Sequence, residues 1–255
     1  MRVIKVSRMN KFELQPNKEG VEKFLFRVTL MRHEEPYYKD EGHDLTPQGV
    51  ENAKATGEKL RASGHINPED KLYLFHSPKP RAQGTLEFVA EGAGISHETK
   101  RPTHQLRSSD IPDREKFMER VVELEHDQEA IAKDHHTNTD LYENNPEFIE
   151  PAAKKKERLY RTLEYLIRSF EKTRPANETA PHIIAVSHFE IITYLIDDVF
   201  GIESMGKYNA PAFGEAILIE AYSQKDENSV KLKITFKEHS REVLFKRSTR
   251  TVEVL

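Results

Sequence analysis

Basic and imidazole side chains stand at the ends of three apolar, β-favouring segments of the chain. Arg32 and His33 follow the first segment, Arg81 stands four residues after the second, and His188 directly follows the third. The three segments are 24–31, 71–77 and 181–187. In an open α/β sheet, ligands bind outside the carboxyl ends of the strands. We therefore expect these four side chains to meet at one pocket.

The side chains at these strand ends suit a phosphoryl group. A guanidinium group matches the geometry of phosphate oxygens and stays charged at any working pH. An imidazole can act as the nucleophile in phosphoryl transfer if one ring nitrogen is unprotonated. The positive charges of Arg32 and Arg81 should favour neutral His33, because like charges disfavour protonation. The expected chemistry is therefore nucleophilic attack by an imidazole on phosphorus.

Four ordered motifs carry a resemblance to a known family. They are Arg32-His33-Glu34, Leu45-Thr46-Pro47-Gln48-Gly49 with Ala53, Ser77-Pro78-Lys79-Pro80-Arg81-Ala82-Gln83-Gly84-Thr85, and Val186-Ser187-His188. Together they resemble the successive motifs of the histidine phosphatase superfamily, also called phosphoglycerate mutase-like, over roughly residues 24–236. Four motifs in the expected strand contexts are far more specific than a single Arg-His pair.

The resemblance implies a fold and a set of residue roles. The implied fold is a three-layer α/β/α sandwich with a mostly parallel central sheet, helices on both faces and a cap insertion. His33 is the implied nucleophile that becomes phosphohistidine, while Arg32, Arg81 and His188 hold the non-bridging oxygens. The mechanism requires no metal ion and no other cofactor. The expected partner is a small phosphorylated substrate or inorganic phosphate.

The chain departs from the family pattern at the general acid. The family places a glutamate two residues after a leucine at a strand end, and the corresponding residue here is Ser108. Serine is a poor proton donor at neutral pH, so another acid is needed. Asp110 in the same loop is the first substitute and Glu190 is the second, while Glu34 and Asp113 are more distant candidates.

Further polar residues complete the predicted substrate-binding site. Besides Arg32, Arg81 and His188, the predicted contacts are Glu34, Tyr37, Ser77 and Glu190. Tyr37 belongs to the polar loop 35–44, which also carries Tyr38 and Lys39 and is expected at the rim of the pocket.

Periodicity predicts the elements that position these residues. Helices are expected from Thr46-Pro47 to Gly64, over 81–90, over 159–172 and over 189–200. Strands are expected over 216–222 and 230–236, the second as a half-solvated antiparallel edge, and the tail from Lys237 is either a further strand or a loose basic end.

The domain prediction separates residues 1–23 from the rest of the chain. Residues 1–23 are expected to form an arm or an edge strand, and residues 24–255 a single domain with a cap insertion at about 110–156. In the cap, a helix around 117–124 and a polar loop over 126–150 suggest a lid. His126, Asp127, Asp134, His135, His136 and Asp140 lie in this loop. We predict no metal site there, because the helical HExxH spacing is absent.

Composition narrows the class of protein. The 43 acidic and 39 basic residues give a formal charge of −4, so a global basic field for nucleic acid is absent. The chain has no cysteine, which excludes disulfides and thiol catalysis and fits a cytoplasmic protein. No apolar run approaches the ~20 residues that span a bilayer. We expect no membrane partner and leave a homodimer open.

Three functions remain open, and hydrolysis is the one that we expect. A metal-independent phosphomonoester hydrolase would attack phosphorus with His33 and later release phosphate to water. A phosphomutase of the same fold would return the phosphoryl group to the substrate, and it needs extra cations that the sequence does not identify. A low-activity module that binds a phosphate ligand or phosphoprotein is favoured only by Ser108 in the acid position.

Overall fold

The computed structural model describes residues 23–66, 70–95, 99–173, 181–201 and 211–255. The arm or edge strand expected over 1–23 lies outside the described residues except for Lys23. The division of the chain into an arm and one domain therefore stays a prediction.

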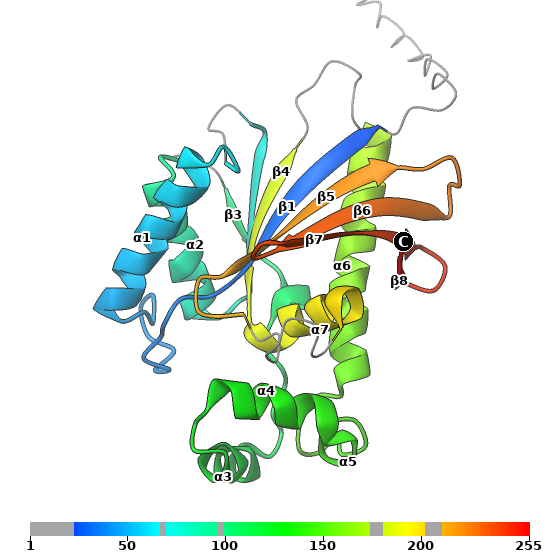
Figure 1. Ribbon diagram of the computed structural model, residues 1–255. Helices are drawn as coiled ribbons and strands as arrows, with labels where there is room; N and C mark the ends of the chain where they lie inside the picture. The colour runs from blue at the N-terminus through cyan, green and yellow to red at the C-terminus, as the bar shows by residue number, and fades with distance from the viewer. Residues whose placement is uncertain (1–22, 67–69, 96–98, 174–180, 202–210) are drawn as a thin grey trace, which may run out of the picture.

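Within the described ranges, one eight-stranded sheet forms the centre of the molecule, in the order β3-β2-β4-β1-β5-β6-β7-β8 (Figure 1). The strands are β1 (Phe24–Arg32), β2 (Leu72–His76), β3 (Lys100–Pro102), β4 (His182–Ser187), β5 (Ala216–Ser223), β6 (Ser229–Phe236), β7 (His239–Lys246) and β8 (Thr251–Val254). β4 and its neighbours β1 and β2 are the three strands predicted from the motif segments.

The expectation of a mostly parallel sheet needs correction. β1, β2, β3 and β4 pair in parallel, but β5 pairs antiparallel with β1, and β6, β7 and β8 continue antiparallel. The reason is that short turns join the last four strands, and such turns connect only antiparallel neighbours. The tail from Lys237 forms β7 and β8, so β6 is an interior strand and not the predicted edge.

Helices cover both faces of the sheet, as expected (Figure 1). α1 (Pro47–Ala62) and α2 (Pro80–Gly92) pack on one face, and α6 (Ala152–Thr173) and α7 (Phe189–Phe200) on the other. β4 is buried on both faces: Ile183 and Ala185 join the core under α6 and α7, whereas Ile184 and Val186 join the core under α1 and α2. This period of two is the expected behaviour of a strand.

Local signals fix where these helices begin and cross. The Thr46 side chain accepts a hydrogen bond from the backbone N–H of Gly49 and so caps α1. α1 and α2 cross closely at two glycines: a Cβ at Gly57 would lie 2.1 Å from the Val89 carbonyl oxygen, and one at Gly92 would lie 2.0 Å from that of Lys54. The missing side chains let the backbones of α1 and α2 pack directly against each other.

The cap region is more helical than expected. It contains α3 (Arg114–Glu123), α4 (Gln128–Thr137) and α5 (Thr139–Tyr142), which lie beyond the carboxyl ends of the parallel strands (Figure 1). The expectation of a polar loop over 126–150 was therefore wrong. Asp127 caps α4 by accepting from the N–H groups of Glu129 and Ala130. These helices share a small core of Tyr142, Phe148 and Ile149.

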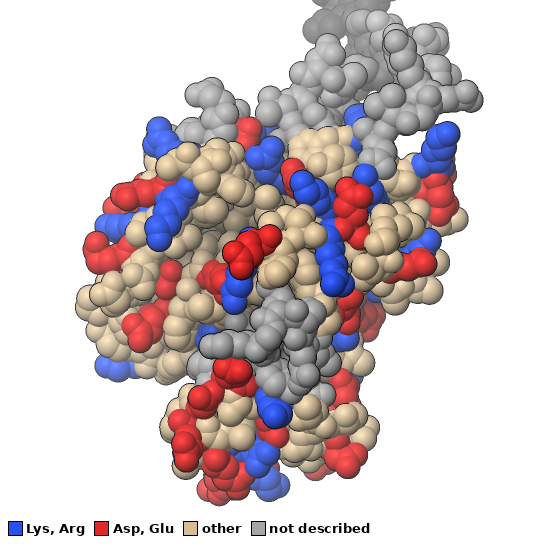
Figure 2. All heavy atoms as spheres, in the orientation of Figure 1, with Lys and Arg blue, Asp and Glu red and all other residues tan. Residues whose placement is uncertain are grey.

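On the face that Figure 2 shows, acidic and basic side chains are mixed, and neither sign forms a continuous charged patch. Of the helices in the described ranges, none combines the length and the apolar character needed to traverse a membrane.

In the cap, Asp134 accepts hydrogen bonds from Arg120 and Tyr142, so this carboxylate already has partners.

Candidate active site

The four residues predicted to converge lie together and are buried. The rings of His33 and His188 have their centroids 5.0 Å apart and meet edge to face. Arg81 donates its Nε–H to Nε2 of His33 over 3.2 Å. Phe213 covers the cluster, with its ring centroid 3.9 Å from the Arg32 guanidinium carbon and 5.7 Å from the His33 ring. The carboxyl ends of β1 and β4 and the first turn of α2 thus assemble one polar site.

The hydrogen bonds of His33 fix which ring nitrogen is free. Its Nδ1 lies 2.8 Å from the backbone oxygen of Glu34, and a carbonyl can only accept, so Nδ1 carries the proton. Nε2 then holds a lone pair, which accepts the hydrogen bond from Arg81. His33 is therefore a neutral imidazole whose Nε2 lone pair faces the Arg81 guanidinium.

Burial and neighbouring charge keep both histidines neutral. Burial is the main cause that lowers the pKa of His33 well below its ordinary value, and His188 and Arg81 lower it further. Burial likewise lowers the pKa of His188, with Arg81 and Arg32 adding to the effect. The sequence argument named the positive charges, but burial is the larger cause.

These shifts predict a specific dependence of stability on pH. Burial also lowers the pKa of His182 to about 3, so three imidazoles stay neutral in the folded protein. In the unfolded chain these imidazoles bind protons below about pH 6.5, whereas in the folded protein they stay neutral. The free energy of unfolding is therefore highest above that pH and falls below it by ~1.4 kcal/mol per pH unit for each histidine. Urea unfolding between about pH 7 and pH 5, above the range of ordinary carboxyl groups, measures this loss.

His182→Gln serves as the comparison for that measurement. This variant should lose about one third of the slope, because one of three titrating groups is removed. A free energy of unfolding that stays level over this range would contradict the expectation.

Hydroxyl groups position the other members of the cluster. His188 Nε2 and the Ser77 hydroxyl are 2.7 Å apart, so the predicted contact residue Ser77 orients an imidazole. Thr85 Oγ1 accepts from the backbone N–H of Glu34 over 2.9 Å and donates to the Arg81 carbonyl over 2.8 Å. One hydroxyl therefore ties the loop after β1 to α2.

Arg32 is held on both sides. It donates from Nη1 to the backbone oxygen of Pro211 over 2.8 Å, and the rings of Phe189 and Phe213 lie against its guanidinium. Burial lowers the pKa of Arg32, and the Tyr38 side chain acts against that shift. This packing fixes the direction of the guanidinium, which a phosphate-binding group requires.

The two predicted acids lie in other environments. Asp110 is bound by Arg107 at 2.5 and 3.2 Å, and this contact lowers the pKa of its exposed carboxyl group. Its hydrogen bonds in the described structure do not reach the four clustered residues. Burial by itself would raise the pKa of Glu190, but the Ser109 N–H at 2.9 Å and Lys155 hold it below its ordinary value. The roles of Asp110 and Glu190 stay predictions.

The remaining predicted contacts differ in placement. Glu34 is buried beside the backbone of Gly214, where an added Cβ would lie 1.9 Å from Glu34 Oε1, and burial raises its pKa. Tyr37 is 51% exposed on the loop after β1, with Lys39 Nζ 5.1 Å from its ring centroid. Tyr37 is thus a rim residue, whereas Glu34 faces inward.

Sequence reasoning missed three residues of this site. Asp40 accepts a hydrogen bond from Arg81 Nη1 at 3.2 Å and pairs with Lys79 at 2.8 Å. Thr85 and Phe213 make the contacts described above. Thr85 could have been found, because it stands in the third motif one helical turn after Arg81. Asp40 and Phe213 stand in loops without a periodic pattern.

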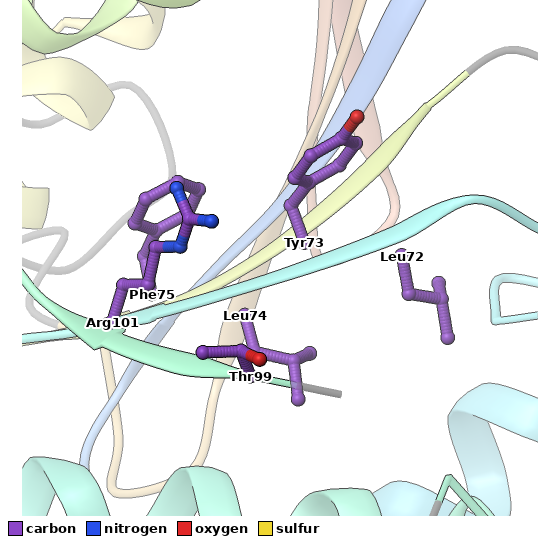
Figure 3. A pocket seen from close by; sticks show the side chains of 6 residues that line it. All are labelled: Leu72, Tyr73, Leu74, Phe75, Thr99 and Arg101. Carbon is purple, nitrogen blue, oxygen red and sulfur yellow. The ribbon is translucent and has the colours of Figure 1, made fainter. Parts of the chain in front are cut away.

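Two cavities lie away from the cluster. One of about 130 Å³ adjoins the β2–β3 edge, where the side chains of Tyr73 and Phe75 point to one side of β2 and those of Leu72 and Leu74 to the other (Figure 3). The other, of about 280 Å³, lies between the sheet and α6 and also reaches Phe75. Neither of these two cavities is lined by the four clustered residues. The candidate site is therefore defined by its polar contacts.

Comparisons with known proteins give one family match and a set of similar folds. A family model described as histidine phosphatase superfamily (branch 1) matches residues 28–232. The solved structure of mycobacterial hydrolase 2 is similar with a TM-score of 0.60 and 17% identity, covering 86% of this chain and 92% of that chain. Comparison with curated proteins gave no match.

Two further solved structures carry named activities. Mycobacterial glucosyl-3-phosphoglycerate phosphatase has a TM-score of 0.58 and 17% identity, with 84% of this chain and 98% of that chain covered. The same phosphatase was also solved with inorganic phosphate. Phosphoglycerate mutase from Bacillus anthracis has a TM-score of 0.55 and 15% identity, with 78% of this chain and 91% of that chain covered. At such identities, these structures show the shared fold.

Proposed function

Because the chain belongs to the histidine phosphatase superfamily (branch 1), we propose that it is a phosphomonoester hydrolase that works through a phosphohistidine on His33. The observation that carries the proposal is the protonation state of the His33 ring. Its Nδ1 proton is engaged by the Glu34 carbonyl, and its Nε2 lone pair faces Arg81. This is the protonation state that a nucleophilic imidazole needs.

The proposed reaction has two steps at the same phosphorus atom. In the first step, Nε2 of His33 attacks in line and the bond to the leaving oxygen breaks. Arg32, Arg81 and His188 surround the attacking nitrogen and stabilise the equatorial oxygens, which is the main contribution to phosphoryl transfer. In the second step, water displaces the imidazole and releases phosphate. None of these steps uses a metal ion.

The substrate that we propose is a small phosphomonoester. The mycobacterial phosphatase of the same fold was solved with inorganic phosphate and with VO3. For this chain, the paired guanidinium groups at buried positions support recognition of the same tetrahedral anion. The cap helices beyond the strand ends are the proposed lid over the rest of the substrate.

Labelling with an alkaline quench tests this function directly. The wild-type protein is mixed with a 32P-labelled phosphomonoester without added metal and quenched within milliseconds. We expect label on the protein that is stable in base and labile in acid, together with released phosphate. A panel of sugar, nucleotide and glycerate phosphates defines the substrate range.

Each outcome of the panel separates the three functions. Isomerised phosphoester without free phosphate would favour the mutase. Saturable binding of phosphate without label or release would favour the binding module. Either result would overturn hydrolysis as the function.

A further inference from the structure

The geometry points to Asp40 as the group that protonates the leaving oxygen, a role that the sequence pattern placed on Asp110. This inference rests on the proposed function and deepens it. It starts from the position of the family's acidic residue, where this chain has Ser108 and therefore no carboxyl group. A phosphomonoester with an alkyl leaving group needs a proton from somewhere near the attacked phosphorus.

Asp40 shares one arginine with the nucleophile. Arg81 donates Nε–H to His33 Nε2 over 3.2 Å and Nη1–H to Asp40 Oδ1 over 3.2 Å. Only one guanidinium group therefore separates the carboxylate from the attacking nitrogen. A guanidinium has five N–H donors, so Arg81 can hold a phosphoryl group and Asp40 at the same time. Asp40 then stands within reach of the leaving oxygen, directly or through one water.

The loop that presents Asp40 has a defined and strained geometry. Its ends are closed by a bridge between Pro36 and Leu45. Tyr38 and Asp40 have φ angles of +59° and +55°, a region that costs non-glycine residues free energy. Asp44 holds the loop in this form by accepting the Lys39 N–H at 2.8 Å. Such strain persists at sites where the direction of a side chain matters.

The charges that face Asp40 explain how it can gain a proton during the reaction. Lys79, at the N-cap of α2, is the main cause that lowers the pKa of Asp40, and Arg81 and Arg114 lower it further. A bound phosphoryl dianion offsets these cations and so raises the pKa of the carboxyl group. Uptake of the proton is then coupled to the arrival of substrate.

The proton balance closes over the two steps. In the first, the His33–phosphorus bond forms, the ester bond breaks, and the alkoxide oxygen takes the Asp40 proton. In the second, water attacks phosphorus and gives its proton to the Asp40 carboxylate, while the phosphorus–nitrogen electron pair returns to His33. The same group acts as acid and then as base.

The rival acids are less well placed for this role. Arg107 binds Asp110 with two hydrogen bonds and does not contact the cluster in the described structure. Asp40 is also partly exposed, at 47% against 61% for Asp110, but the arginine that binds it contacts His33. Glu190 is fixed to the backbone of Ser109, where it holds the cap loop against α7. Glu34, the buried candidate, lies against Gly214, and its Oε2 has no hydrogen-bond partner. Of these four carboxylates, Asp40 is the one with a side-chain hydrogen bond to the cluster in the described structure.

A leaving-group comparison tests the inference. Asp40→Asn is assayed on p-nitrophenyl phosphate, whose leaving group needs little protonation, and on glycerol 2-phosphate, whose leaving group needs a full proton. We expect kcat to fall by about 10²–10⁴ on glycerol 2-phosphate and by less than about tenfold on p-nitrophenyl phosphate. Glu41→Gln removes the same charge from an exposed position of the same loop and should show no such split.

Three results would overturn the inference. Equal losses on both substrates would make Asp40 a structural residue. A gain in kcat/KM on both substrates would mean that Asp40 only competes with the substrate phosphoryl group for Arg81. A split in Asp110→Asn that is absent in Asp40→Asn would return the role to Asp110. A folded wild-type protein that forms no phosphohistidine at all would instead remove the proposed function, and the acid role with it.

Discussion

Replacing His33 with glutamine is expected to reduce kcat/KM by roughly 10⁴–10⁶, the scale seen when a covalent nucleophile is removed. Glutamine keeps a polar side chain of similar length, but its amide nitrogen has no lone pair for attack. The 32P label on the protein should disappear together with the activity. Steady-state assays and the quench experiment measure both effects on the same preparation.

His76 provides a matched control for this variant. It also ends a strand, is buried, and has its Nδ1 2.8 Å from the backbone oxygen of the following residue, Ser77. His76→Gln therefore removes the same kind of backbone contact without touching the proposed nucleophile. We expect it to retain the phosphohistidine label. If His33→Gln kept as much activity as His76→Gln, attack by His33 would be excluded.

The second large effect is expected for Arg32→Met. Arg32 is held between the Pro211 carbonyl and the Phe213 ring, so its charge is directed at one place. Cationic groups that stabilise the transferring phosphoryl group contribute about 10³–10⁵ to kcat. We expect a loss in that range, with a smaller change in KM, because the charge acts mainly on the transition state.

Arg27→Met makes the same substitution in the same strand, outside the site. The Arg27 guanidinium lies 5.8 Å from the ring centroid of Phe24, at the other end of β1. Thermal unfolding of both variants shows whether Arg32→Met acts through folding. Comparable losses of activity in the two variants would mean that Arg32 has no special role in the reaction.

Much of the parallel half of the fold follows from local sequence patterns. The segments that became β1, β2 and β4 are apolar runs bounded by polar motifs, and β4 is apolar because both of its faces are buried. Helix starts such as Thr46-Pro47 combine a cap with a proline in the first turn, and the structure begins α1 there. The convergence of the four site residues then follows from the rule for strand ends.

The cap and the antiparallel half were harder to predict. The apolar residues around 117–124 predicted α3, although none of its side chains is buried. α4 was not predicted, because it carries charged and polar side chains over most of its length. Their helical state depends on side-chain caps and on contacts within the cap. The antiparallel pair over 216–222 and 230–236 was predicted and is confirmed. The composition of the tail from Lys237 did not reveal that it adds two further antiparallel strands.

Asp40 shows why the site itself could not be completed from sequence. It stands seven positions after His33, in a loop without hydrophobic periodicity. Its contact with Arg81 exists only because the loop bends back through residues with positive φ. Contacts of that kind depend on the tertiary fold, whereas the motif residues stand at strand ends that periodicity can locate.

Thr85 couples the two segments that carry facing side chains of the site. Its single hydroxyl oxygen accepts a hydrogen bond from the backbone N–H next to His33 and donates one to the carbonyl of Arg81. Together with the Arg81–His33 contact, this makes two links between the loop after β1 and α2. A displacement of α2 relative to β1 would have to stretch both links, which favours a constant spacing between the two side chains.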